Sequence, residues 1–163
     1  MPRVGPARAV LYGAAVVGTL DILDAFVFFG VRSGAQPVRI LQGIAAGLIG
    51  RPAAVQGGWA TAALGLFLHY FIAFGIVLIY VSVSRVVPVL ARRPLLFGPL
   101  YGIAAYFVMN LVVVPLSRIG GSFGPPLPVL ANGLLIHMFG VGLPSALAAA
   151  AAWGRRGKEA GGG

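Results

Sequence analysis

The sequence predicts an all-α, polytopic membrane protein: a bundle of four transmembrane helices with one short interfacial or re-entrant helix at about residues 39–50. Three observations predict this class. Of the 163 residues, 59% are hydrophobic and 9% are charged, and the mean hydropathy is +0.96, outside the range of soluble domains. Four apolar runs reach about 20 residues, the length that crosses a bilayer. The basic residues stand singly or in pairs between these runs, so the net charge of +9 indicates membrane topology and no nucleic-acid partner.

The first span is expected at about residues 9–31, after Arg3 and Arg8. Two acidic residues, Asp21 and Asp24, interrupt this span. A cleaved signal peptide is the alternative, but the apolar region is too long for one and carboxylates inside it would be unusual. We therefore expect a helix that stays in the membrane.

Residues 32–58 hold three arginines, Arg32, Arg39 and Arg51, around a short apolar run. The run from residue 40 to residue 50 covers only about half of the hydrocarbon thickness at roughly 1.5 Å per residue. It therefore predicts a helix that lies at the interface or re-enters the bundle. The arginines could bind anionic lipid headgroups or an anionic solute, and contact with lipid is favoured.

The remaining spans are expected at about residues 59–83, 95–116 and 129–153. Trp59 is placed as an interfacial anchor of the second span. Pro115 lies near the end of the third, and Pro144 should kink the fourth. Residues 117–128 are rich in Gly and Pro and predict a loop. Residues 1–163 thus form a single integral membrane domain whose tail, residues 154–163, is expected to be disordered.

The distribution of basic residues predicts the orientation of the chain. The two termini and the loop after the second span carry eight of them, whereas the other two loops carry four. Because positive charge is retained on the cytoplasmic side, both termini are expected in the cytoplasm. The abundance of Ala, Gly and Arg is typical of a bacterial genome rich in G and C, so a multi-pass protein of the bacterial inner (plasma) membrane is expected.

Polar residues from all four spans are predicted to form one layer in the outer half of the bundle. A carboxylate within a span costs about 2.5 to 3.5 kcal/mol, so it needs partners. Counting about 1.5 Å per residue from the outer end of each span places these residues roughly 9 to 15 Å deep. Small residues flank them, which favours side chains that point into the bundle. The layer comprises Asp21, Asp24, His69, Asn110 and His137, and Tyr106 and Asn132 could join it.

Several functions remain open for this layer. Two carboxylates one helical turn apart, with His nearby, favour the binding or passage of a small solute or cation. Alternatively, His69 and His137 could be the axial ligands of a b-type haem, or these two residues and Asp21 could hold a divalent metal. The layer could also simply fix helix register in a structural or accessory subunit of a membrane complex.

Enzymatic activity is not favoured, because the sequence shows no metalloprotease, serine-hydrolase or phosphate-loop motif. The chain has no Cys, which excludes disulfides and thiolate ligands. The lipid bilayer is the expected partner, and a homodimer or a larger membrane complex is compatible with so small a bundle.

Several stretches of the chain carry a resemblance to known sequences: Arg39 to Gly50, Gly57 to His69, Tyr101-Gly102, Met109-Asn110, Pro115 to Ser117, His137-Met138 and Val141 to Pro144. They resemble a family of small, uncharacterised bacterial inner-membrane proteins with four predicted spans. The resemblance covers about residues 10–150 and implies the same architecture and location, but no activity. It includes His69, Asn110 and His137, together with the short segment, which could cover the polar layer as a lid.

Overall fold

The computed structural model describes residues 4–121 and 123–153, and these ranges contain helices and connecting segments but no strand. Four helical stretches are long and apolar enough to cross a membrane, and one shorter apolar helix precedes the second of them. The predicted all-α fold with four spans and a short helix is confirmed. The stretches are Pro6–Ser33, Gly58–Val86, Pro94–Leu116 and Leu127–Trp153. The predicted disorder of residues 154–163 concerns residues outside the described ranges.

Proline and glycine set the boundaries of these helices, and the predicted spans are correct to within three residues at each end. Proline stands in the first turn of α1, α2, α5 and α6, where its missing N–H costs no hydrogen bond. Gly34 ends α1 in the left-handed conformation, with a φ of 66°, and its N–H is bonded to Gly30 O. The short helices α3 and α5 were not predicted. In chain order the elements are α1 (Pro6–Ser33), α2 (Pro37–Ile49), α3 (Arg51–Gln56), α4 (Gly58–Val86), α5 (Pro88–Arg92), α6 (Pro94–Val108), η1 (Met109–Val113), α7 (Val114–Leu116), α8 (Leu127–Ile136), η2 (His137–Gly142) and α9 (Leu143–Trp153).

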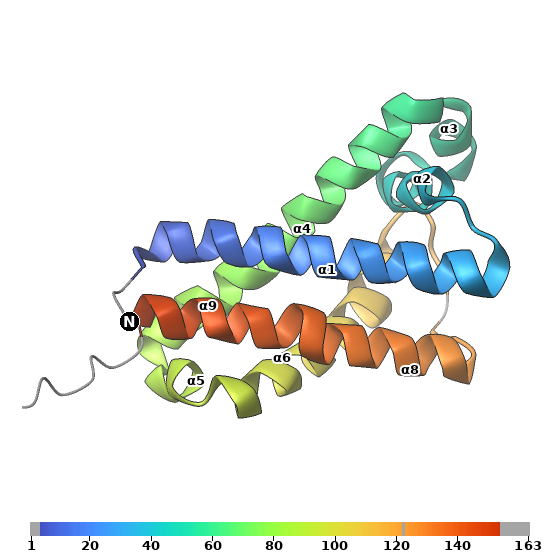
Figure 1. Ribbon diagram of the computed structural model, residues 1–163. Helices are drawn as coiled ribbons and strands as arrows, with labels where there is room; N and C mark the ends of the chain where they lie inside the picture. The colour runs from blue at the N-terminus through green and yellow to red at the C-terminus, as the bar shows by residue number, and fades with distance from the viewer. Residues whose placement is uncertain (1–3, 122, 154–163) are drawn as a thin grey trace, which may run out of the picture.

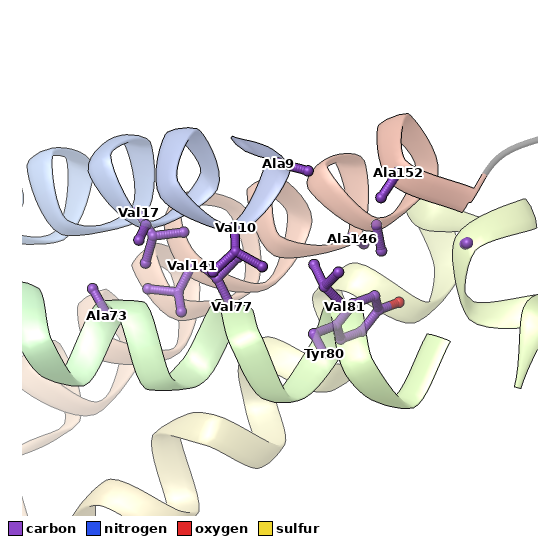
Figure 2. Packing of buried hydrophobic residues seen from close by; sticks show 13 residues of the cluster. Ala9, Val10, Val17, Ala73, Val77, Tyr80, Val81, Val141, Ala146 and Ala152 are labelled. Carbon is purple, nitrogen blue, oxygen red and sulfur yellow. The ribbon is translucent and has the colours of Figure 1, made fainter. Parts of the chain in front are cut away.

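Small residues fill the core, and large apolar side chains cover the surface. Where α1, α4 and α9 meet, the buried cluster is mostly Ala and Val, with Val17 and Val77 almost fully enclosed (Figure 2). Leu11, Phe67 and Leu135 are 60%, 65% and 56% exposed. This distribution suits lipid as the solvent, because small residues let helices approach closely while the apolar surface is solvated by acyl chains.

The short helix α2 packs across one end of α4, beside the end of α1 (Figure 1). At Gly65 of α4 the backbone of Leu41 comes so close that no Cβ would fit. The segment after the third span joins this end as well, because Arg118 N–H donates to Gly47 O at 2.8 Å. The first described residues lie at the opposite end, next to α9 (Figure 1). The loops predicted to share one side of the membrane therefore lie together.

The third and fourth spans each contain one π-helical turn, η1 and η2. A proline follows each turn by two residues, Pro115 after η1 and Pro144 after η2. Proline cannot supply the N–H that the carbonyl four residues earlier would use, so the helix widens locally instead of breaking. Asn110 lies in η1 and His137 begins η2. Because π turns often lie at functional sites, their positions support both residues as candidates for a functional site.

Candidate functional site

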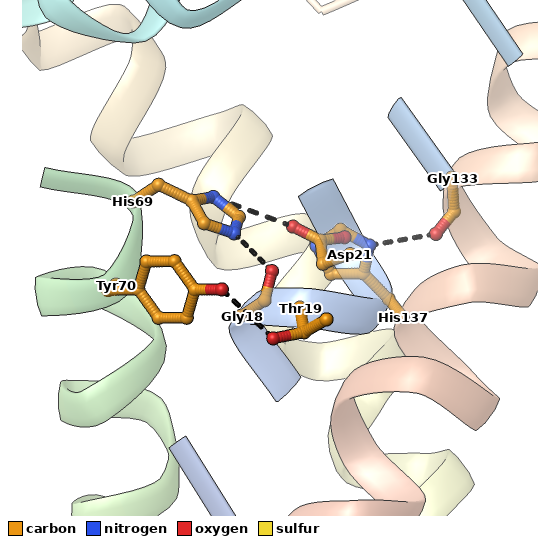
Figure 3. Close-up of polar contacts among 7 residues, drawn as sticks. All are labelled: Gly18, Thr19, Asp21, His69, Tyr70, Gly133 and His137. Atoms are coloured by element: carbon orange, nitrogen blue, oxygen red, sulfur yellow. Dashed lines mark hydrogen bonds and ion pairs between the residues drawn. The ribbon is translucent and has the colours of Figure 1, made fainter. Parts of the chain in front are cut away.

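Asp21 of α1 and His69 of α4 face each other across the helix contact (Figure 3). His69 Nδ1 lies 4.0 Å from Asp21 Oδ2, and the two side chains are 11% and 29% exposed. The other ring nitrogen, Nε2, lies 2.8 Å from Gly18 O. A carbonyl oxygen can only accept, so Nε2 carries the hydrogen. In the neutral ring Nδ1 therefore presents its lone pair toward Asp21.

His137 is held in the complementary tautomer. Its Nδ1 lies 2.9 Å from Gly133 O and must donate to it, which leaves the lone pair of the neutral ring on Nε2. The Tyr106 ring packs edge-on against the imidazole, with centroids 5.2 Å apart. Gly133 makes this possible, because a Cβ there would lie 2.5 Å from the ring of Tyr106. At Gly102 the backbone of α6 touches that of His137 directly. The ring is therefore fixed in position by its own helix and by α6.

A cavity of about 320 Å³ brings together the predicted polar residues of all four spans. This volume lies at the small end of the range for ligand sites. Most of the wall is formed by apolar side chains, and α2 contributes Ile40 and Ile44 to it. The polar residues that line the cavity are Asp21, His69, Asn110 and His137. The short helix thus forms part of the enclosure.

Three residues predicted for the layer, Asp24, Tyr106 and Asn132, do not line this cavity. Asp24 accepts a hydrogen bond of 2.7 Å from Asn132 Nδ2, which joins α1 to α8. Tyr106 is buried behind His137 and accepts, through its backbone oxygen, a 2.9 Å bond from Asn110 Nδ2. Asp24 therefore has its own partner, and Asp21 is the carboxylate of the cavity.

The charges in the cavity wall favour a positively charged guest. Asp21 is the only carboxylate among the lining residues, and none of them is Lys or Arg. Two imidazole lone pairs accompany it, one on each His. A proton on His69 Nδ1, or a cation beside Asp21 Oδ2, would compensate the carboxylate. An anion would meet no fixed positive charge among these residues.

Sequence reasoning missed the residues that support His69. Gly18 supplies the carbonyl that fixes its tautomer, and the Tyr70 ring packs on Gly18 while its hydroxyl lies 2.9 Å from Thr19 Oγ1 (Figure 3). The available signal was the position of Gly18, three residues before Asp21, since a small residue permits close helix contact. Nothing in the sequence indicated that Ile40 and Ile44, among the many apolar residues of the chain, would line the cavity.

The cofactor hypotheses stay predictions. Both His N–H groups are bonded to backbone carbonyls, which is common for metal-ligating His. Within the described ranges, however, no group of three or more His, Cys, Asp or Glu is arranged to hold a metal ion, and the trio His69, His137 and Asp21 is not such a group. Comparison of the chain with protein-family models, with curated proteins and with solved structures gives no match.

Proposed function

We propose that the protein binds a small cationic solute in the cavity at Asp21, as the binding step of its passage across the membrane. The observation that carries this proposal is the chemistry of the wall: one carboxylate, two imidazoles and one amide in an otherwise apolar enclosure of about 320 Å³. A carboxylate in a membrane span is costly, and one that faces a cavity commonly marks an ion or solute path.

The geometry of His69 supports a site at which a proton and a cation could compete. Its Nδ1 lies 4.0 Å from Asp21 Oδ2, and its Nε2 donates to Gly18 O, so Nδ1 is the nitrogen that could take up a proton beside the carboxylate. A cation bound at Asp21 would compete with such a proton. Competition of this kind is the basis of proton-coupled exchange.

The location and orientation belong to the same proposal. The distribution of basic residues favours a bacterial inner membrane with both termini in the cytoplasm. In that orientation α2 lies on the outer side, and its Ile40 and Ile44 form the part of the cavity wall nearest the medium in this proposal. Entry of the solute would then require α2 to move, as a lid does.

A thermal-shift experiment on the detergent-purified protein tests the binding step. The panel comprises lithium, sodium, potassium, ammonium, methylammonium and guanidinium chlorides, with sodium gluconate as the anion control. A cation at about 100 times its dissociation constant stabilises by roughly 2.7 kcal/mol, which raises the Tm by about 5 to 10 °C for a chain of this size. Asp21→Asn should abolish that rise.

Asp24→Asn is the matched control, because it makes the same change one turn away on the same helix. The new amide oxygen can still accept from Asn132 Nδ2, so this variant should keep the full cation response. If no cation shifts the Tm, or if Asp21→Asn changes only the basal Tm, the residue fixes helix register and the proposal fails. A Soret band that disappears in His69→Ala, or metal at one equivalent per chain, would also contradict it.

A further inference from the structure

A second, smaller cavity lies between α2 and α3, apart from the one at Asp21. Its volume is about 280 Å³. Two arginines line it, Arg39 of α2 and Arg51 of α3, together with the amide of Gln42. Small and apolar residues form the remaining wall, among them Ala46, Ala54 and Ile119. The charge of this wall is therefore positive, whereas the wall of the Asp21 cavity carries a carboxylate and no Lys or Arg.

The guanidinium of Arg39 is held in place by a chain of hydrogen bonds. Its Nη1 donates to Gln42 Oε1 at 3.1 Å, and Gln42 Nε2 donates to Gly58 O at 2.9 Å. Gln42 is only 4% exposed, so the anchor itself is fixed inside the protein. A guanidinium has five N–H donors and this bond uses one, so most of its donors remain for a ligand. Arg39, one of the two arginines, is therefore oriented before a ligand arrives.

The two arginines have no acidic partner in the described part of the chain. The sequence contains three acidic residues, and the third, Glu159, lies outside the described ranges. Of the other two, Asp21 faces His69 and Asp24 accepts from Asn132. The positive charge of this cavity thus calls for an anion from outside the described residues, and guanidinium groups bind phosphate oxygens in pairs.

We infer that the cavity between α2 and α3 binds a phosphate group. It lies beside the start of α4, where Trp59 is 79% exposed, and exposed Trp is typical of the headgroup level of a bilayer. Phosphate at that level is supplied by anionic lipid headgroups, and free phosphate reaches the same level from water. This inference does not rest on the cation proposed at Asp21.

The test measures binding to the full-length protein in a neutral detergent by native mass spectrometry. The three probes are a short-chain phosphatidylglycerol, the diacylglycerol with the same chains but no phosphate, and inorganic phosphate. We expect phosphatidylglycerol to bind and the diacylglycerol not to. The double variant Arg39→Gln, Arg51→Gln should bind at least roughly tenfold more weakly, because each lost guanidinium removes charge-assisted hydrogen bonds.

Arg32→Gln is the matched control, since Arg32 is an exposed arginine near the same end of the molecule but does not line the cavity. Its affinity should stay within about twofold of the unaltered protein. The Tm of each variant, measured on the same samples, shows whether the fold is kept.

The two sources of phosphate give different results. Binding of phosphatidylglycerol alone assigns the site to a lipid headgroup, whereas binding of inorganic phosphate alone assigns it to a free anion, and both results support a phosphate site. Equal binding of the diacylglycerol would overturn the inference. So would a folded double variant with unchanged affinity for every probe, or the absence of binding by both phosphate probes.

Discussion

The close contact between α1 and α4 at Gly18 predicts a large effect from a single methyl group. A Cβ on Gly18 would lie 2.6 Å from two ring carbons of Tyr70, whereas ordinary contacts begin near 3.4 Å. The ring must therefore retreat by about 0.8 Å, and it is also bonded to Thr19 by its hydroxyl at 2.9 Å. Gly18→Ala thus perturbs the residue whose backbone carbonyl accepts the hydrogen bond from His69.

The magnitude follows from opposing contributions. Overpacking costs about 1 to 3 kcal/mol, and loss of the Tyr70–Thr19 hydrogen bond about 1 kcal/mol more. Replacing Gly by Ala inside a helix returns about 0.5 to 1 kcal/mol. The net expectation is a destabilisation of about 1 to 3.5 kcal/mol. The cation response should also weaken, because the residue whose carbonyl orients His69 is displaced.

The assay is unfolding in mixed micelles followed by circular dichroism, with the cation-induced Tm shift measured in parallel. Gly75→Ala in α4 is the control, because a Cβ at Gly75 meets no atom within 4 Å and should stabilise by about 0.5 to 1 kcal/mol. If Gly18→Ala is as stable as Gly75→Ala and binds cations equally well, the reasoning about this contact is wrong.

Two further predictions concern α8 and α2. Asn132→Leu should destabilise the protein by about 1 to 3 kcal/mol in the same unfolding assay, because Asp24 loses the hydrogen-bond donor that lies at 2.7 Å. Adding Asp24→Leu should recover most of that loss, because no unpaired carboxylate then remains. A double variant as unstable as the single one would contradict this pairing. Because the chain has no Cys, single-Cys variants report directly on the packing of α2. Ala45→Cys, at a position that is 0% exposed, should react slowly with a membrane-impermeant maleimide, whereas Gly43→Cys, in the wall of the arginine cavity, should react quickly. Uniform labelling along α2 would contradict a packed lid.

The four spans could be predicted from the sequence because hydropathy and length are local properties of the chain. The existence of α2 as a short apolar helix also followed from the sequence, since its 13 residues are too few to cross a membrane. Its packing on α4 did not, because that contact depends on Gly65, one small residue among the many in the chain. Small residues indicate that a helix contact exists without indicating which helix makes it.

The residues of the candidate site could be predicted from the sequence, but their hydrogen-bond partners could not. Depth along each span brought Asp21, His69 and His137 to one level, and all three line one cavity. Depth could not separate Asp21 from Asp24, which lie about one turn apart and about 60° from each other around the helix axis at roughly 100° per residue. That difference sends Asp24 to Asn132 and leaves Asp21 in the cavity. The angle could be calculated from the sequence, but the identity of the neighbouring helix could not.

The two proposed sites share one helix, and this gives them a physical connection. Ile40 and Ile44 lie four residues apart on one face of α2 and line the Asp21 cavity, whereas Arg39 and Gln42, on another face, line the arginine cavity. If α2 moves relative to α3 when a solute enters, Arg39 is carried away from Arg51 on α3. A phosphate held between the two arginines would therefore resist that movement and favour the closed cavity. Because such coupling is reciprocal, a solute enclosed below α2 would strengthen phosphate binding by the same factor.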